Sequence, residues 1–108
     1  MEEIPRIDQL IQRPTLEQII KVTADEFYVS TESILKLRKG GKIKNKPRKV
    51  AMYIAQKIWD YRLKEIMRFL GLKHYGAVGN AIFMVASELK ESPELNLTIN
   101  TIIKRVDP

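Results

Sequence analysis

The chain has no cysteine and only one histidine, His74, among its 108 residues. The absence of cysteine excludes a disulfide framework, a zinc–thiolate site and thiol chemistry. A single histidine cannot supply the histidine pair of many metal sites, and no glycine-rich phosphate loop of the kind GxxxxGKS or GxxxxGKT occurs. We therefore expect the protein not to be an enzyme and to hold no metal or cofactor.

Long apolar runs are also missing. No stretch approaches the roughly 18 consecutive apolar residues that a membrane-spanning helix needs. The opening MEEIPRIDQL mixes acidic and apolar residues and is unlike a secretory signal. A chain of 108 residues is long enough for one compact core. We expect a soluble cytoplasmic protein with no membrane partner, made of a lead-in or linker over residues 1–13 and one domain over residues 14–108.

Acidic residues are absent from one strongly basic segment, residues 36–49. The formal net charge is +6, and this segment holds eight of the 19 basic residues, so the rest of the chain carries 11 basic and 13 acidic residues. A local basic cluster on a nearly neutral domain is typical of polyanion binding through phosphate neutralisation. A solvated, disordered loop explains the charge equally well. The basic residues of the segment are Lys36, Arg38, Lys39, Lys42, Lys44, Lys46, Arg48 and Lys49.

Apolar residues recur at helical spacing along most of the chain, and no strand pattern competes with them. Thr15 with Gln18 three residues later indicates a capping box at the first helix start. Ser92 followed by Pro93 indicates the start of the last helix. The sequence therefore predicts an all-α fold of about six helices, over residues 16–28, 32–37, 47–63, 63–71, 75–90 and 93–106.

The fourth and fifth predicted helices are joined by a short turn that begins at Gly71, which is the pattern of a helix-turn-helix. In this motif the second helix enters the major groove of DNA and its N-terminal residues lie near the base edges. Small residues there let the backbone approach DNA, while Asn80 suits adenine and Ala77 suits a thymine methyl group. The candidate DNA-binding residues of this helix end are Lys73, His74, Tyr75, Gly76, Ala77 and Asn80.

Each of these candidates also has a purely structural interpretation. Gly76 and Gly79 would allow two helices to pack closely, His74 would be a hydrogen-bonded turn residue, and Tyr75 would be a core aromatic. Other large side chains fall at core spacing and are expected inside. These are Trp59, Phe69, Met52, Met67 and Met84.

The order of these parts resembles a known family. The stretches LEQIIKVTADEFYVS, KPRKVAMYIAQKI and LKEIMRFLGLKHYGAVGNAI are similar to the C-terminal DNA-binding domain of the bacterial replication initiator DnaA. They resemble still more its relatives at the C-terminus of REP-associated tyrosine transposases, which carry a Gly-Leu-x-x-Tyr turn. The resemblance covers about residues 13–90. It implies an all-α fold with a helix-turn-helix, like that of the DnaA C-terminal domain and the Trp repressor.

The resemblance also implies roles for particular residues. In the initiators the basic loop sends an arginine into the minor groove, and a basic residue after the loop's proline binds phosphate. Here these roles fall on Lys46, Arg48 and Lys49, with Lys44 a looser candidate, in a loop whose phosphate contacts include Lys39 and Lys42. The initiators read bases with an Asp-His-Thr-Thr-Val signature, of which the matching positions 74–78 share only the valine.

Taken together, the residues and the resemblance predict a domain that binds double-stranded DNA at two points. The basic loop holds phosphates and reaches the minor groove, while residues 73–80 dock in the major groove. The transposase resemblance implies an accessory domain beside an upstream catalytic domain or partner protein. Two other functions are open, namely a protein-interaction domain and an RNA-binding domain, although the chain lacks the interleaved aromatics that stack on unpaired bases.

Overall fold

A computed structural model of the protein describes residues 13–36 and 45–107, and these residues form helices and connecting turns with no strand among them. The helices are α2 (Leu16–Glu26), α3 (Thr31–Leu35), α4 (Lys46–Tyr53), the π-helical segment η1 (Ile54–Ile58), α5 (Leu63–Phe69), α6 (Tyr75–Leu89) and α7 (Pro93–Val106). The predicted all-α fold is confirmed.

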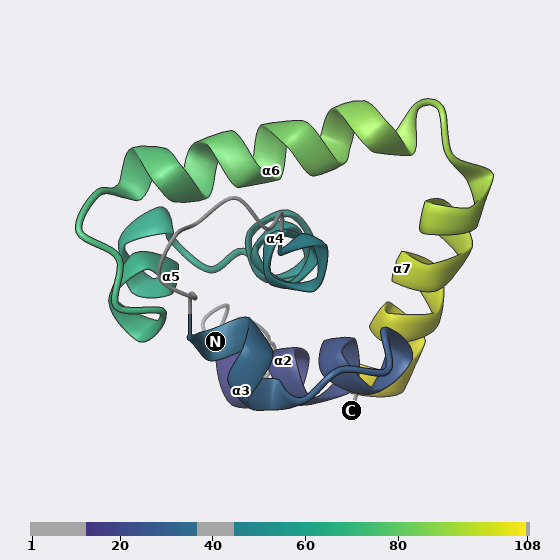
Figure 1. Ribbon diagram of the computed structural model, residues 1–108, viewed down its shortest axis with the longest axis horizontal. Coiled ribbons are helices and arrows are strands. Elements are labelled where there is room, and N and C mark those ends of the chain that lie inside the picture. Colours follow the sequence, from purple (N-terminus) through teal and green to yellow (C-terminus); the bar gives the residue numbers. More distant parts are fainter. Residues whose placement is uncertain (1–12, 37–44, 108) are drawn as a thin grey trace, which may run out of the picture.

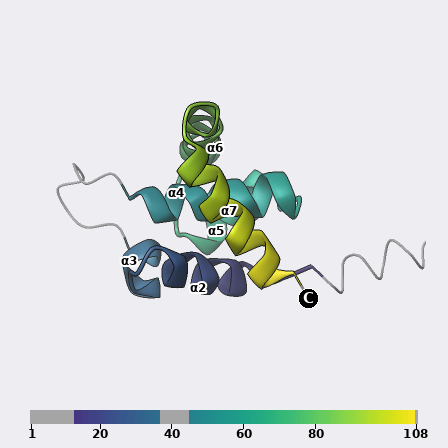
Figure 2. The ribbon, with the colours of Figure 1, turned by 90° about the vertical axis from the view of Figure 1, so that its right-hand side faces the viewer.

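Helix α4 lies at the centre of the fold. In Figure 1 it is seen nearly end-on, with α6 above it, α7 to the right, α2 and α3 below and α5 to the left. Figure 2, turned by 90°, shows α4 lying between α6 and α2 with α7 crossing in front. The core therefore forms around α4, whose buried apolar residues are Val50, Ala51 and Met52.

Local signals in the sequence account for most helix ends. Thr15 and Gln18 form the predicted capping box, since Thr15 Oγ1 accepts from Gln18 N at 3.1 Å and Gln18 Oε1 accepts from Thr15 N at 2.9 Å. Ser30 and Ser92 cap α3 and α7 through their side chains alone, which accept from Ser33 N and from Leu95 N. Gly71 follows α5 with φ of +69°, the left-handed conformation that glycine adopts without strain.

The third predicted helix, residues 47–63, is shorter and less regular than expected. α4 continues as η1 and the helical backbone stops at Trp59, after which Asp60 has φ of +61°. Aspartate tolerates this conformation better than most residues. The wider last turn redirects the chain, so that the Tyr61 hydroxyl donates to Pro14 O at 2.7 Å. The structure thus ends the helix at Ile58, five residues early, in favour of a tertiary contact.

The core consists of the apolar stripes of the helices, with two corrections to the expected set. Phe69 is 37% exposed and Met84 is 39% exposed, so neither is a core residue. Both lie beside a buried position, Leu70 and Val85, and one residue turns a helical side chain by about 100°. Met52 is buried as expected, and Trp59 and Met67 pack against the core while partly exposed.

Helix α7 closes the bundle against α2. Four of its apolar side chains are buried, namely Leu95, Ile99, Ile102 and Val106. At its last turn Arg105 forms ion pairs with Glu26 at 2.6 Å and with Asp25 at 2.7 Å. The hydrogen bond with Glu26, followed by that with Asp25, raises the pKa of the Arg105 guanidinium. The closing helix is therefore joined to α2 by both apolar packing and charge.

Candidate nucleic-acid interface

Helices α5 and α6 form the predicted helix-turn-helix. The turn between them is closed by backbone hydrogen bonds, from Gly71 N to Arg68 O at 3.2 Å and from Leu72 N to Met67 O at 2.9 Å. Leu72 packs against the core and holds the turn in place. The inner face of α6 buries Val78, Ala81, Ile82 and Val85. This packing leaves the opposite face at the start of α6 open to solvent.

The exposed start of α6 carries five of the predicted binding residues. Tyr75 is 54% exposed, and His74, Gly76, Ala77 and Asn80 are exposed as well. His74 precedes the helix without capping it through its side chain. The Asn80 amide makes only a long contact, with Nδ2 3.8 Å from Met84 Sδ. The interpretation of Tyr75 as a core aromatic is therefore wrong, and the side chains needed for base contacts reach the surface.

The two glycines of α6 are not explained by close helix packing. A Cβ atom built on Gly76 or on Gly79 would meet nothing within 4 Å. The packing interpretation of these glycines is therefore wrong. A glycine in a helix costs about 1 kcal/mol of stability relative to alanine. Because no neighbouring side chain requires glycine at these two positions, an external molecule that approaches the helix backbone is an alternative explanation for them.

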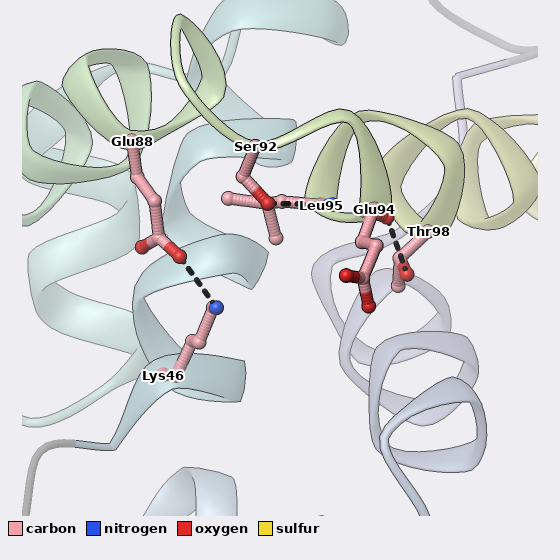
Figure 3. Close-up of polar contacts among 6 residues, drawn as sticks. All are labelled: Lys46, Glu88, Ser92, Glu94, Leu95 and Thr98. Atoms are coloured by element: carbon pink, nitrogen blue, oxygen red, sulfur yellow. Dashed lines mark hydrogen bonds and ion pairs between the residues drawn. The ribbon is translucent and has the colours of Figure 1, made fainter.

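Two exposed or half-exposed lysines lie in the first turn of α4 and face α6. Lys46 Nζ lies 2.6 Å from Glu88 Oε2, and Lys49 Nζ lies 3.7 Å from Met84 Sδ. Figure 3 shows the first of these contacts, which joins the start of α4 to the end of α6. Asn45 caps α4, with its Oδ1 accepting from Arg48 N at 3.1 Å. The end of the basic segment is thereby held beside α6.

Arg48 requires a correction to the expected phosphate contacts. Its side chain is only 4% exposed, and its guanidinium donates to Ile34 O at 2.6 Å, Leu35 O at 3.0 Å and Leu70 O at 3.3 Å. Burial lowers the pKa of this guanidinium. These carbonyls belong to the C-terminal ends of α3 and α5. Carbonyl groups at a helix C-terminus have no hydrogen-bond donor within their own helix, and they attract cations. Arg48 thus joins α3, α4 and α5, and its side chain is not free to bind phosphate.

Three cations, two on α5 and one at its N-cap, were missed by the sequence interpretation. Arg62, Lys64 and Arg68 are exposed and line an open groove with Arg13, Asp60, Glu65 and Phe69. Within residues 13–36 and 45–107, none of the three forms an ion pair. The i, i+4 spacing of Lys64 and Arg68, opposite the buried face of α5, is the signal that points to them. In a helix-turn-helix the first helix crosses the DNA backbone.

The other predicted contacts divide between two parts of the chain. Lys73 is exposed in the turn before α6, as expected. Lys39, Lys42 and Lys44 lie outside the described residues.

Among the described residues no group of three acidic, histidine or cysteine side chains is placed to hold a metal ion. None of the helices in that part of the chain is long and apolar enough to cross a membrane.

Comparison with known proteins identifies relatives of this arrangement. Residues 16–85, which run from the start of α2 to near the end of α6, match the family described as bacterial dnaA protein helix-turn-helix. The chromosomal replication initiator protein DnaA of Lachnoclostridium phytofermentans is 30% identical over 94 residues, which are 87% of this chain and 20% of that protein. The DnaA of Deinococcus radiodurans is 35% identical over 60 residues, which are 56% of this chain and 13% of that protein.

A third relative extends the same pattern. The DnaA of Nautilia profundicola is 30% identical over 96 residues, which are 85% of this chain and 21% of that protein. The chain thus spans about a fifth or less of the length of these relatives.

Proposed function

Because the chain belongs to the family of the bacterial DnaA helix-turn-helix, we propose that it binds double-stranded DNA through this motif. The observation that carries the proposal is the exposed start of α6, where residues 74–77 are exposed and a Cβ atom built on Gly76 would meet nothing within 4 Å. Lysines of α4 and cations of α5 lie on two of the helices that pack against α6. This combination suits a helix that enters a groove while its neighbours bind phosphate.

In the proposed complex each part has its own task. Asn80 pairs with an adenine edge and Ala77 contacts a thymine methyl group, while His74 and Tyr75 reach a base edge or a phosphate. Lys46, Lys49 and Lys73 neutralise phosphates, as do Lys64 and Arg68 on α5. Lys39, Lys42 and Lys44, which lie outside the described residues, are proposed to hold phosphates and to reach the minor groove.

The DNA site is proposed to differ from the one that the initiators recognise. Only Val78 of the initiators' Asp-His-Thr-Thr-Val signature is present, and Val78 is buried. The proposed role as an accessory domain of a transposase-like protein rests on the Gly-Leu-x-x-Tyr turn alone, since the relatives named above are replication initiators. We propose residues 14–108 as the folding unit, because α7 adds four buried side chains to the core.

Duplex binding measured as a function of salt tests the proposal. A pool of random duplexes is selected on the domain, and the affinity of the selected duplex is then measured from low to high salt. If about five or six cations meet phosphates, log K falls against log[salt] with a slope near −5. A flat salt response contradicts the proposal.

The variant Asn80→Ala tests, in the same experiment, whether Asn80 recognises the DNA sequence. Its expected effect is a lower affinity for the selected duplex and an unchanged affinity for random DNA, because only a base contact depends on sequence. Equal losses on both duplexes would remove the base-reading role. A polypeptide that stays bound after nuclease treatment and at high salt would favour a protein-interaction domain, and preference for structured RNA over duplex DNA would favour RNA binding.

A further inference from the structure

The contact between Lys46 and Glu88 joins two elements that are 42 residues apart in the chain. Its Nζ to Oε2 distance is 2.6 Å, and the two side chains are 46% and 44% exposed. No acidic residue lies between Glu32 and Asp60, so the partner of Lys46 has to come from another part of the fold. Figure 3 shows Glu88 extending from the end of α6 towards the start of α4. The capped start of α7 follows closely, with Leu95 N donating to Ser92 Oγ at 3.1 Å.

Both charges lie at the helix end that disfavours them. Lys46 is the first residue of α4, where the positive end of the helix dipole repels a cation. Glu88 lies in the last turn of α6, where the negative end repels an anion. Neither charge therefore stabilises its own helix. Each is compensated by the other, and an approaching anion at the start of α4 would replace Glu88 as the partner of Lys46.

We propose that Glu88 is an internal competitor of the DNA backbone for Lys46, an inference that rests on the proposed function. In the free domain Glu88 neutralises Lys46. When DNA binds, a phosphate takes over Lys46 and Glu88 is left as an uncompensated negative charge near the duplex. An ion pair this exposed contributes little to stability and exchanges readily. Glu88 thereby reduces the affinity for any phosphate backbone, and binding depends more on the base contacts of α6.

Glu88→Gln tests this inference because it removes the charge and keeps the size of the side chain. Relative to the unmodified domain, the slope of log K against log[salt] is expected to become steeper by about 0.9, which corresponds to about fivefold tighter binding at 0.15 M salt. The gain is expected on random duplex DNA as well as on a selected site. In a Lys46→Ala background no ion pair is broken on binding, so the same substitution is expected to change the slope much less, through only the screened repulsion between Glu88 and the duplex.

Glu91→Gln is the matched control, since it removes the same charge three residues further on, at an exposed position. Any of three results would overturn the inference. The slope of log K against log[salt] could stay unchanged in Glu88→Gln, it could change equally in Glu91→Gln, or the full change could persist when Glu88→Gln is combined with Lys46→Ala. Those results leave duplex binding by the unmodified domain intact. If the unmodified domain shows no salt-dependent duplex binding, the proposed function fails and this inference fails with it.

Discussion

At the scale of single residues, adjacent basic side chains have opposite surroundings. The Arg48 guanidinium is buried among three carbonyls from α3 and the end of α5, whereas Lys49 is half-buried beside Met84 of α6. Successive side chains on a helix point in directions about 100° apart. Arg48 therefore faces the ends of α3 and α5, whereas Lys49 faces α6. The same basic segment thus contributes both to stability and to the candidate interface.

Arg48→Ala is expected to destabilise the fold. It would leave buried carbonyls without a donor, and each such group costs about 1–3 kcal/mol, so we expect the free energy of unfolding to fall by about 2–4 kcal/mol. Urea denaturation followed by circular dichroism measures this loss. Lys49→Ala is the matched control, with little change in stability and weaker duplex binding. Wild-type stability in Arg48→Ala, together with a loss of DNA affinity, would instead make Arg48 the phosphate ligand that the sequence suggested.

Gly76→Leu is expected to separate binding from folding. The position is in open space, and leucine has a better helix propensity than glycine, which itself is about 0.8–1.0 kcal/mol less favourable than alanine, so stability is expected to stay the same or rise. The added side chain would hold α6 away from the groove and lower duplex affinity at least tenfold. Thermal unfolding and a binding titration on the same sample measure both effects. A variant that unfolds would restore the packing interpretation.

At the scale of helices, α7 has an apolar stripe whose packing partners are set by the tertiary structure. The family match ends at Val85, yet α7 lies beyond it and buries an apolar stripe against α2 and α6. The periodicity of residues 93–106 was enough to predict this helix and its inner face. The sequence could not show which helices it covers, because that depends on packing between distant segments.

Ile102→Ala tests the importance of α7 to the core. Ile102 has no exposed surface, so truncation is expected to lower the free energy of unfolding by about 2–5 kcal/mol. Leu97→Ala is the matched control on the same helix, since Leu97 is 69% exposed and its truncation removes little buried area. Chemical denaturation of the two variants gives the comparison. Equal effects would mean that α7 does not pack on the domain as described.

At the scale of the whole molecule, the basic side chains of different helices have different partners. The lysines of α4 contact the C-terminal half of α6, and Lys64 and Arg68 lie on the helix that precedes α6. Arg105 at the end of α7 is instead engaged by Asp25 and Glu26 of α2. Arg105 is thus engaged by carboxylates, whereas Lys64 and Arg68 form no ion pair among the described residues. The likeness to DnaA proteins fits this division, because the matched residues 16–85 include the helix-turn-helix and the start of α4.

The sequence by itself determined the features that depend on neighbours along the chain. The helical periods, the capping boxes, the turn at Gly71 and the absence of disulfide and thiolate chemistry follow from residues within a few positions of each other, and the family resemblance follows from their order. The tertiary structure decided the features that depend on distant contacts. It alone turned Arg48 inward, gave Lys46 its partner Glu88, ended η1 at Ile58 and left Gly76 in open space, because these outcomes arise only when α3, α5 and α6 pack around α4.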